Sequence, residues 1–140
     1  MRWPIGVAGP PREIDALTHG TDLLPTLIEL CHLPGARPGA FDGLSLCPLL
    51  AGQSGAFDQR KLVVQYGAEF KEWDSTVLWG KWRLVKGTEL YDLASDPGQG
   101  NDVAATRPDI VSALRAHYQS QLGPTKAVMG RPISSWSVHR

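Results

Sequence analysis

The apolar residues of this chain change their spacing near residue 60, and this change limits the fold more than any other feature of the sequence. Before it, apolar residues recur at the i, i+3, i+4 and i+7 positions of one helix face. These residues are Leu24, Leu27, Ile28 and Cys31. After it, apolar and polar residues alternate, as is typical of strands with one buried face. The predicted strands cover 62–66, 76–79, 82–86 and 89–93. A helix followed by strands predicts the α+β fold class.

The predicted helix spans residues 22–33. Asp22 can cap its start by accepting a hydrogen bond from a backbone N–H of the first turn. Pro25 falls in that same turn, where a missing N–H costs little. Pro34 and Gly35 are expected to stop the helix.

Residues 60–122 are predicted to form a small antiparallel sheet covered on one face by a helix over 107–122. Gly80-Lys81 suits the two-residue type II′ turn of a β-hairpin. Gly123-Pro124 is expected to end the second helix. We interpret residues 53–59 as a linker and residues 123–140 as an irregular tail.

Composition and charge exclude several classes of function. The 14 Lys and Arg residues balance the 14 Asp and Glu residues, without a basic block, so no nucleic-acid partner is expected. The sequence lacks the apolar run of about 18 residues that a membrane span requires. Cys31 and Cys47 lack zinc-site spacing, and their leucine-rich surroundings favour buried free thiols over a disulfide. The cysteines do not indicate a cellular compartment.

Four segments occur together in the order and spacing found in arylsulfatases, the formylglycine-dependent sulfatases. They are residues 2–4 (RWP), 21–30 (TDLLPTLIEL), 42–52 (DGLSLCPLLAG) and 80–104, which contains GKWRL, ELYDLASDP and NDVA. Over residues 2–122 the chain therefore resembles the C-terminal portion of such a sulfatase. The resemblance implies an alkaline-phosphatase-like fold, in which residues 1–52 form the end of a large α/β domain. Residues 60–122 would then form its small antiparallel-sheet subdomain.

The resemblance also implies a chemistry whose residues this sequence lacks. The family makes formylglycine from Cys or Ser in the pattern Cys/Ser-x-Pro-x-Arg, and it holds calcium with Asp and Asn oxygens. Neither Cys31 nor Cys47 has Pro two places later, and Gln99 replaces the Arg that would follow Ser95 and Pro97. We therefore predict no catalytic and no metal-binding residues in this chain. Formylglycine, calcium and a sulfate ester substrate are expected only in a full-length family member.

Two residues are candidates for a functional site. His19 stands three places before Asp22, without a nucleophile or metal partner nearby, so a structural or capping role is predicted. In the family, loops of the small subdomain can border the substrate cleft. Trp73, in the charged loop 69–74, is the candidate for that rim.

Two functional hypotheses follow. In the first, the chain is a sulfatase fragment, inactive alone. In the second, it is a standalone non-catalytic binding or interaction module derived from a sulfatase. The resemblance implies that helix 22–33 packs on a large α/β domain in a whole sulfatase. In this chain the apolar face of that helix is expected to be open to self-association.

Overall fold

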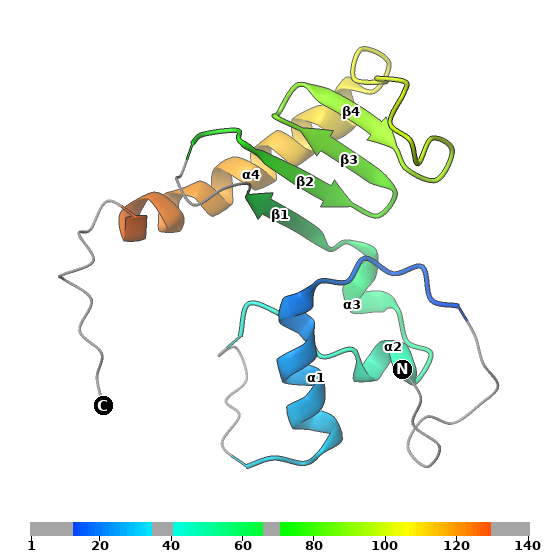
Figure 1. Ribbon diagram of the computed structural model, residues 1–140, viewed down its shortest axis with the longest axis vertical. Coiled ribbons are helices and arrows are strands. Elements are labelled where there is room, and N and C mark those ends of the chain that lie inside the picture. Colours follow the sequence, from blue (N-terminus) through cyan, green and yellow to red (C-terminus); the bar gives the residue numbers. More distant parts are fainter. Residues whose placement is uncertain (1–12, 35–40, 66–70, 130–140) are drawn as a thin grey trace. The chain divides into compact units, whose positions relative to one another are not determined.

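The computed structural model describes residues 13–34, 41–65 and 71–129, with side chains up to residue 121. The chain divides into two compact units, residues 1–60 and residues 61–140 (Figure 1). We describe each unit by itself.

Unit 1 is built from short helical segments. The 3-10 turn η1 (Gly20–Asp22) leads into helix α1 (Leu23–Leu30), and the turns α2 (Cys47–Leu50) and α3 (Gly55–Asp58) follow. Leu49 from α2 and Phe57 from α3 are buried. Residues 55–58, within the linker predicted at 53–59, form the helical turn α3.

Helix α1 is shorter than the predicted 22–33 and ends differently. The N–H of Leu33 donates to the Ile28 carbonyl at 3.0 Å, and the N–H of His32 donates to the Glu29 carbonyl at 3.2 Å. His32 has a φ of 50°. This is a Schellman motif, in which a left-handed residue satisfies the last carbonyls of a helix. The helix thus ends at Leu30, four residues before Pro34, which is not the residue that stops it.

Unit 2 contains the predicted antiparallel sheet. Its strands are β1 (Lys61–Gln65), β2 (Ser75–Trp79), β3 (Trp82–Val85) and β4 (Glu89–Asp92), in the order β1-β2-β3-β4. Gly80 and Lys81 join β2 to β3. Gly80 has the positive φ of 52° that the predicted turn needs at its first central position. The prediction of an antiparallel sheet in this region is confirmed.

Helix α4 (Pro108–Met129) covers one face of this sheet (Figure 1). Directly opposed residues of β2, β3 and β4 form the sheet side of the core, and one face of α4 forms the other side. The core residues are Val77, Leu84, Leu90, Ile110, Leu114 and Tyr118. The helix continues through Gly123-Pro124 to Met129, so its predicted end at 122 is wrong. A proline inside a helix removes one backbone hydrogen bond and kinks the helix, but it need not end it.

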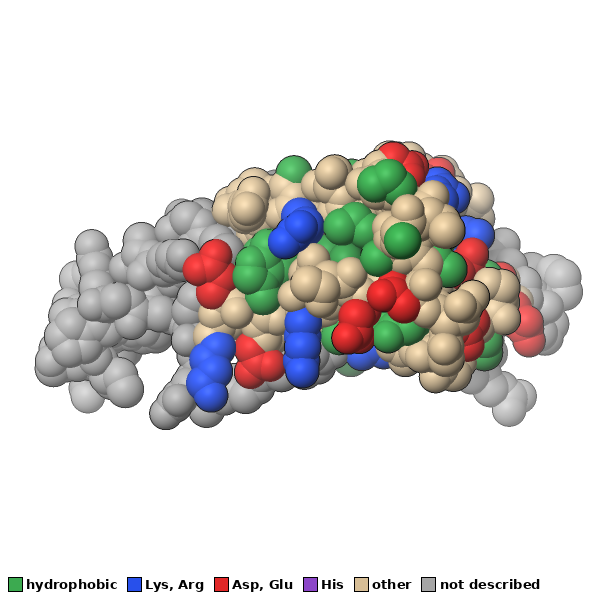
Figure 2. Space-filling view, turned by 90° about the horizontal axis from the view of Figure 1, so that it is seen from above, with side chains coloured by type: hydrophobic (Ala, Val, Ile, Leu, Met, Phe, Trp, Pro, Cys, Tyr) green, Lys and Arg blue, Asp and Glu red, His purple; other side chains and the backbone are tan. Residues whose placement is uncertain are grey.

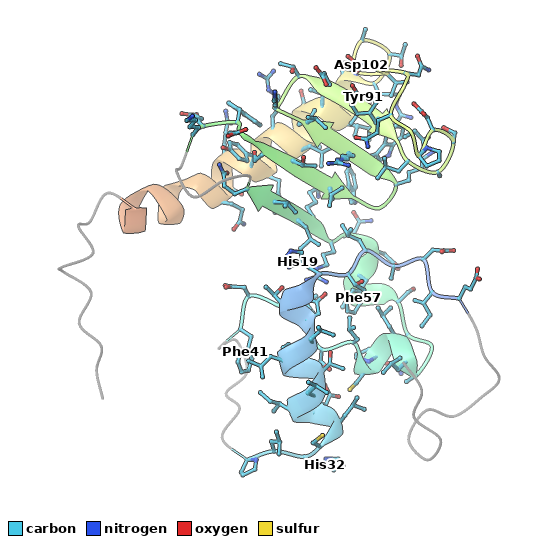
Figure 3. The ribbon with its side chains drawn as sticks, viewed as in Figure 1. His19, His32, Phe41, Phe57, Tyr91 and Asp102 are labelled. Atoms are coloured by element: carbon cyan, nitrogen blue, oxygen red, sulfur yellow. The ribbon has the colours of Figure 1, made fainter. Side chains whose placement is uncertain are left out.

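The loop after β4 protects the edge of the sheet. Asp102 accepts a hydrogen bond from the Leu90 N–H at 2.9 Å, and the Val103 N–H donates to the Leu90 carbonyl at 2.8 Å. Figure 3 shows Asp102 beside β4 and Tyr91. An open edge strand invites pairing with another chain, and these two bonds close part of that edge.

Candidate functional site

Unit 1 contains a buried ion pair between Asp22 and Arg60. The guanidinium donates from Nη1 to Oδ2 at 2.7 Å and from Nη2 to Oδ1 at 2.6 Å. Asp22 is 0% exposed and Arg60 is 9% exposed. A bidentate Arg–carboxylate pair fixes both the distance and the orientation of the two segments that carry it.

Two backbone groups complete the surroundings of the Asp22 carboxylate. The His19 N–H donates to Oδ2 at 2.7 Å, and the Leu44 N–H donates to Oδ1 at 2.9 Å. Burial acts to raise the pKa of this carboxyl, but the hydrogen bonds from Arg60, His19 and Leu44 and the charge of Arg60 outweigh it. They lower the pKa to about 2. Each oxygen thus accepts two hydrogen bonds within the protein, so Asp22 serves the architecture of unit 1.

The prediction that the Asp22 side chain caps helix α1 is wrong. A capping side chain needs an extended backbone at the N-cap position. Asp22 instead has a helical φ of −76° and ψ of −18°, and its side chain makes no capping bond to α1. Arg60 lies 38 residues further along the chain, and no local pattern in the sequence pointed to it.

Thr26 and Gly43 extend the same network, which we call the Asp22 node: Asp22, Arg60, Thr26 and the backbone of 43–46. The Thr26 hydroxyl donates to the Asp22 carbonyl at 2.5 Å and accepts from the Leu46 N–H at 2.8 Å. A Cβ on Gly43 would overlap the Thr21 carbonyl, so only glycine lets this backbone approach. The node joins two segments, TDLLPT and DGLSL, that carry the resemblance to sulfatases.

The lowered pKa of Asp22 predicts a specific loss of stability in acid. A carboxyl whose pKa is about 2 in the folded chain and 3.8 ordinarily stabilises the fold above pH 4. This contribution, about 2 kcal/mol at about 1.4 kcal/mol per pH unit, is lost as the pH falls from 4 to 2. Urea unfolding of the chain and of Asp22→Asn at several pH values measures it. An equal acid dependence in both proteins would contradict the role of Asp22.

His19 has the predicted structural or capping role. Its ring Nδ1 accepts from the Thr21 N–H at 3.4 Å, and its own N–H donates to Asp22, so it caps η1 reciprocally. The ring is exposed, at the N-terminal end of α1, whereas His32 lies at the other end (Figure 3). These contacts make His19 a capping residue, as predicted.

Trp73, the candidate for the substrate rim, packs against the core of unit 2. Its indole stacks on the Tyr118 ring with centroids 4.1 Å apart and an interplanar angle of 26°. The backbone N–H of Trp73 donates to the Tyr118 hydroxyl at 2.8 Å. The Arg115 guanidinium carbon lies 5.4 Å from the centre of the indole. The backbone of Trp73 has a φ of 65°, which is uncommon for a bulky residue and shows that these contacts hold it in place.

The Trp73 indole packs directly against Gly87, so a larger side chain at position 87 should destabilise unit 2. A Cβ at position 87 would lie 2.7 Å from Cδ2 and 2.8 Å from Cζ3 of Trp73, and Gly87 has a φ of 73°. Gly87→Ala should therefore lower the free energy of unfolding by about 1–3 kcal/mol through overpacking. The matched control is Gly80→Ala, since Gly80 also has a positive φ but nothing within 4 Å of its Cβ position. Equal losses in thermal melts of the two variants would contradict the contact with Trp73.

Basic side chains cover the two tryptophans at the β2–β3 turn. The Lys61 ammonium lies 4.2 Å from the centre of the Trp79 ring, and that of Lys81 lies 4.7 Å from the centre of Trp82. Arg107 lies 5.0 Å from the same Trp82 ring. Both tryptophans also pack against the core. They extend the core towards the turn and carry cation–π contacts there.

Cys31, Cys47 and His117 differ in their exposure to solvent. Cys31 and Cys47 are free thiols, as predicted, but Cys31 is exposed and Cys47 is half-buried. The expectation of buried thiols is therefore wrong, because the α1 face that carries Cys31 is uncovered. His117 is half-buried on α4, where burial and, to a smaller extent, the charge of Lys61 lower its pKa.

The described residues contain no group of three or more His, Cys, Asp or Glu side chains that could hold a metal ion. Within the same residues, no helix is long and apolar enough to cross a membrane. Figure 2 shows acidic, basic and apolar side chains interspersed over the visible face, with no large patch of one charge.

Solved sulfatases share this fold. A candidate sulfatase from Bacteroides thetaiotaomicron aligns with a TM-score of 0.57 and 27% identity, over 75% of this chain and 24% of that one. A 6S-sulf protein from a Bacteroides thetaiotaomicron locus for glycosaminoglycan metabolism aligns with a TM-score of 0.51 and 22% identity, over 71% and 24%. A 2-O GAG sulfatase aligns with a TM-score of 0.48 and 25% identity, over 84% and 26%. No protein-family model and no curated protein matches the chain.

The described chain is therefore an α+β protein with the fold of part of a sulfatase. The predicted resemblance to part of a sulfatase is confirmed at the level of the fold. The chain spans about a quarter of the length of the solved structures that it matches, as expected of the C-terminal portion of such a protein.

Proposed function

We propose that this chain is the C-terminal portion of a sulfatase, a sulfuric ester hydrolase, and that it supplies structure to that enzyme and not chemistry. The observation that carries the proposal is the likeness to the candidate sulfatase, at 27% identity over 75% of this chain. In the full-length enzyme, formylglycine would supply the nucleophile and calcium would neutralise the sulfate ester. Both would lie in a part of the enzyme outside the segments that this chain resembles.

The roles of the motif residues support this proposal. Asp22 is a buried acid in a sulfatase-like segment, and both of its carboxylate oxygens accept hydrogen bonds from other residues of the chain. Asp102, in the NDVA segment, accepts hydrogen bonds from the N–H groups of Leu90 and Ala104 at one oxygen, Oδ1. An acid that accepts hydrogen bonds from the protein at each oxygen is poorly suited to general acid–base work. We infer that the chain alone is inactive.

Trp73 is the residue that we propose for the substrate rim of the full-length enzyme. Its ring is only half-buried, so part of its edge can border a bound sulfate ester. The stack on Tyr118 would then hold that edge in position, which is how rigid aromatic side chains serve binding sites. We do not assign it any part in the chemical step.

The DNA upstream of the codon for Met1 tests the proposed function. We expect an in-frame Cys/Ser-x-Pro-x-Arg segment and a paired Asp-Asp metal motif. An in-frame stop codon with neither motif on its upstream side would overturn the assignment as a sulfatase fragment.

A second candidate is a standalone non-catalytic module that binds carbohydrate or another protein chain. The Asp22 node favours it, because this node gives unit 1 a buried polar centre of its own. Amide hydrogen exchange over α1 in a monomeric sample tests it. Strong protection across Leu23–Leu30 would favour the module, and rapid exchange would favour the fragment.

A further inference from the structure

We draw no further inference here: the strongest candidate, the exposed apolar face that Leu23, Leu24 and Leu27 form on helix α1, carries none because nothing in the structure shows what covers it.

Discussion

Replacing Arg60 with Met should lower the free energy of unfolding of unit 1 by about 3–5 kcal/mol, because it leaves a buried carboxylate without its counter-ion. Asp22 is fully buried, and Arg60 provides two of its four hydrogen bonds. Methionine matches the length and apolar stem of arginine, so the loss reports the charge and its donors. A loss of this size is comparable with the total stability of a small folded unit.

The matched control is Arg107→Met, which removes the cation of an exposed ion pair. The Arg107 Nη2 lies 3.1 Å from Asp109 Oδ2, and the two side chains are 43% and 62% exposed. Solvent screens such pairs, so this variant should lose less than about 1 kcal/mol. Urea unfolding measures both variants. Equal losses from Arg60→Met and Arg107→Met would mean that the Asp22 node does not hold unit 1 together.

Truncating Leu114 to alanine should lower the free energy of unfolding of unit 2 by about 2–5 kcal/mol. Leu114 lies on α4 and is 0% exposed, among core side chains contributed by β2, β3 and β4. The lost contacts and the cavity left behind both contribute to the cost. Leu44→Ala is the control, since Leu44 is 41% exposed. Thermal melts that shift equally for the two variants would show that α4 does not cover the core face of the sheet.

The sheet of unit 2 could be predicted because its signals are local. Alternating residues define each strand, and Gly80 permits a turn that brings β2 and β3 into register with Trp79 opposite Trp82. Pairs between neighbouring strands then follow from short loops. The sequence does not predict the C-terminal end of α4, because Gly123-Pro124 is typical of a helix stop and the helix continues past it.

The Asp22 node could not be predicted, because it joins residues that are far apart in the sequence. The neighbours of Asp22 are typical of a helix start, which favours a capping role. Its carboxylate instead accepts hydrogen bonds from Arg60 and Leu44, which are distant in the sequence. Gly87 and Trp73 present the same difficulty, since neither residue's surroundings in sequence reveal their contact. The periodicity of α1 correctly indicated an apolar face. A periodic pattern does not say what covers such a face, and in this chain the face is exposed.

The most direct test of the central claim, that this chain carries sulfatase architecture without sulfatase chemistry, is a hydrolysis assay on the purified chain. Aryl sulfates and sugar sulfates would be offered with and without added calcium. We expect no turnover and no effect of calcium on thermal stability, since the sequence lacks the nucleophile motif and the described residues hold no metal-binding cluster. Turnover that scales with the concentration of this protein and persists after repurification would contradict the claim.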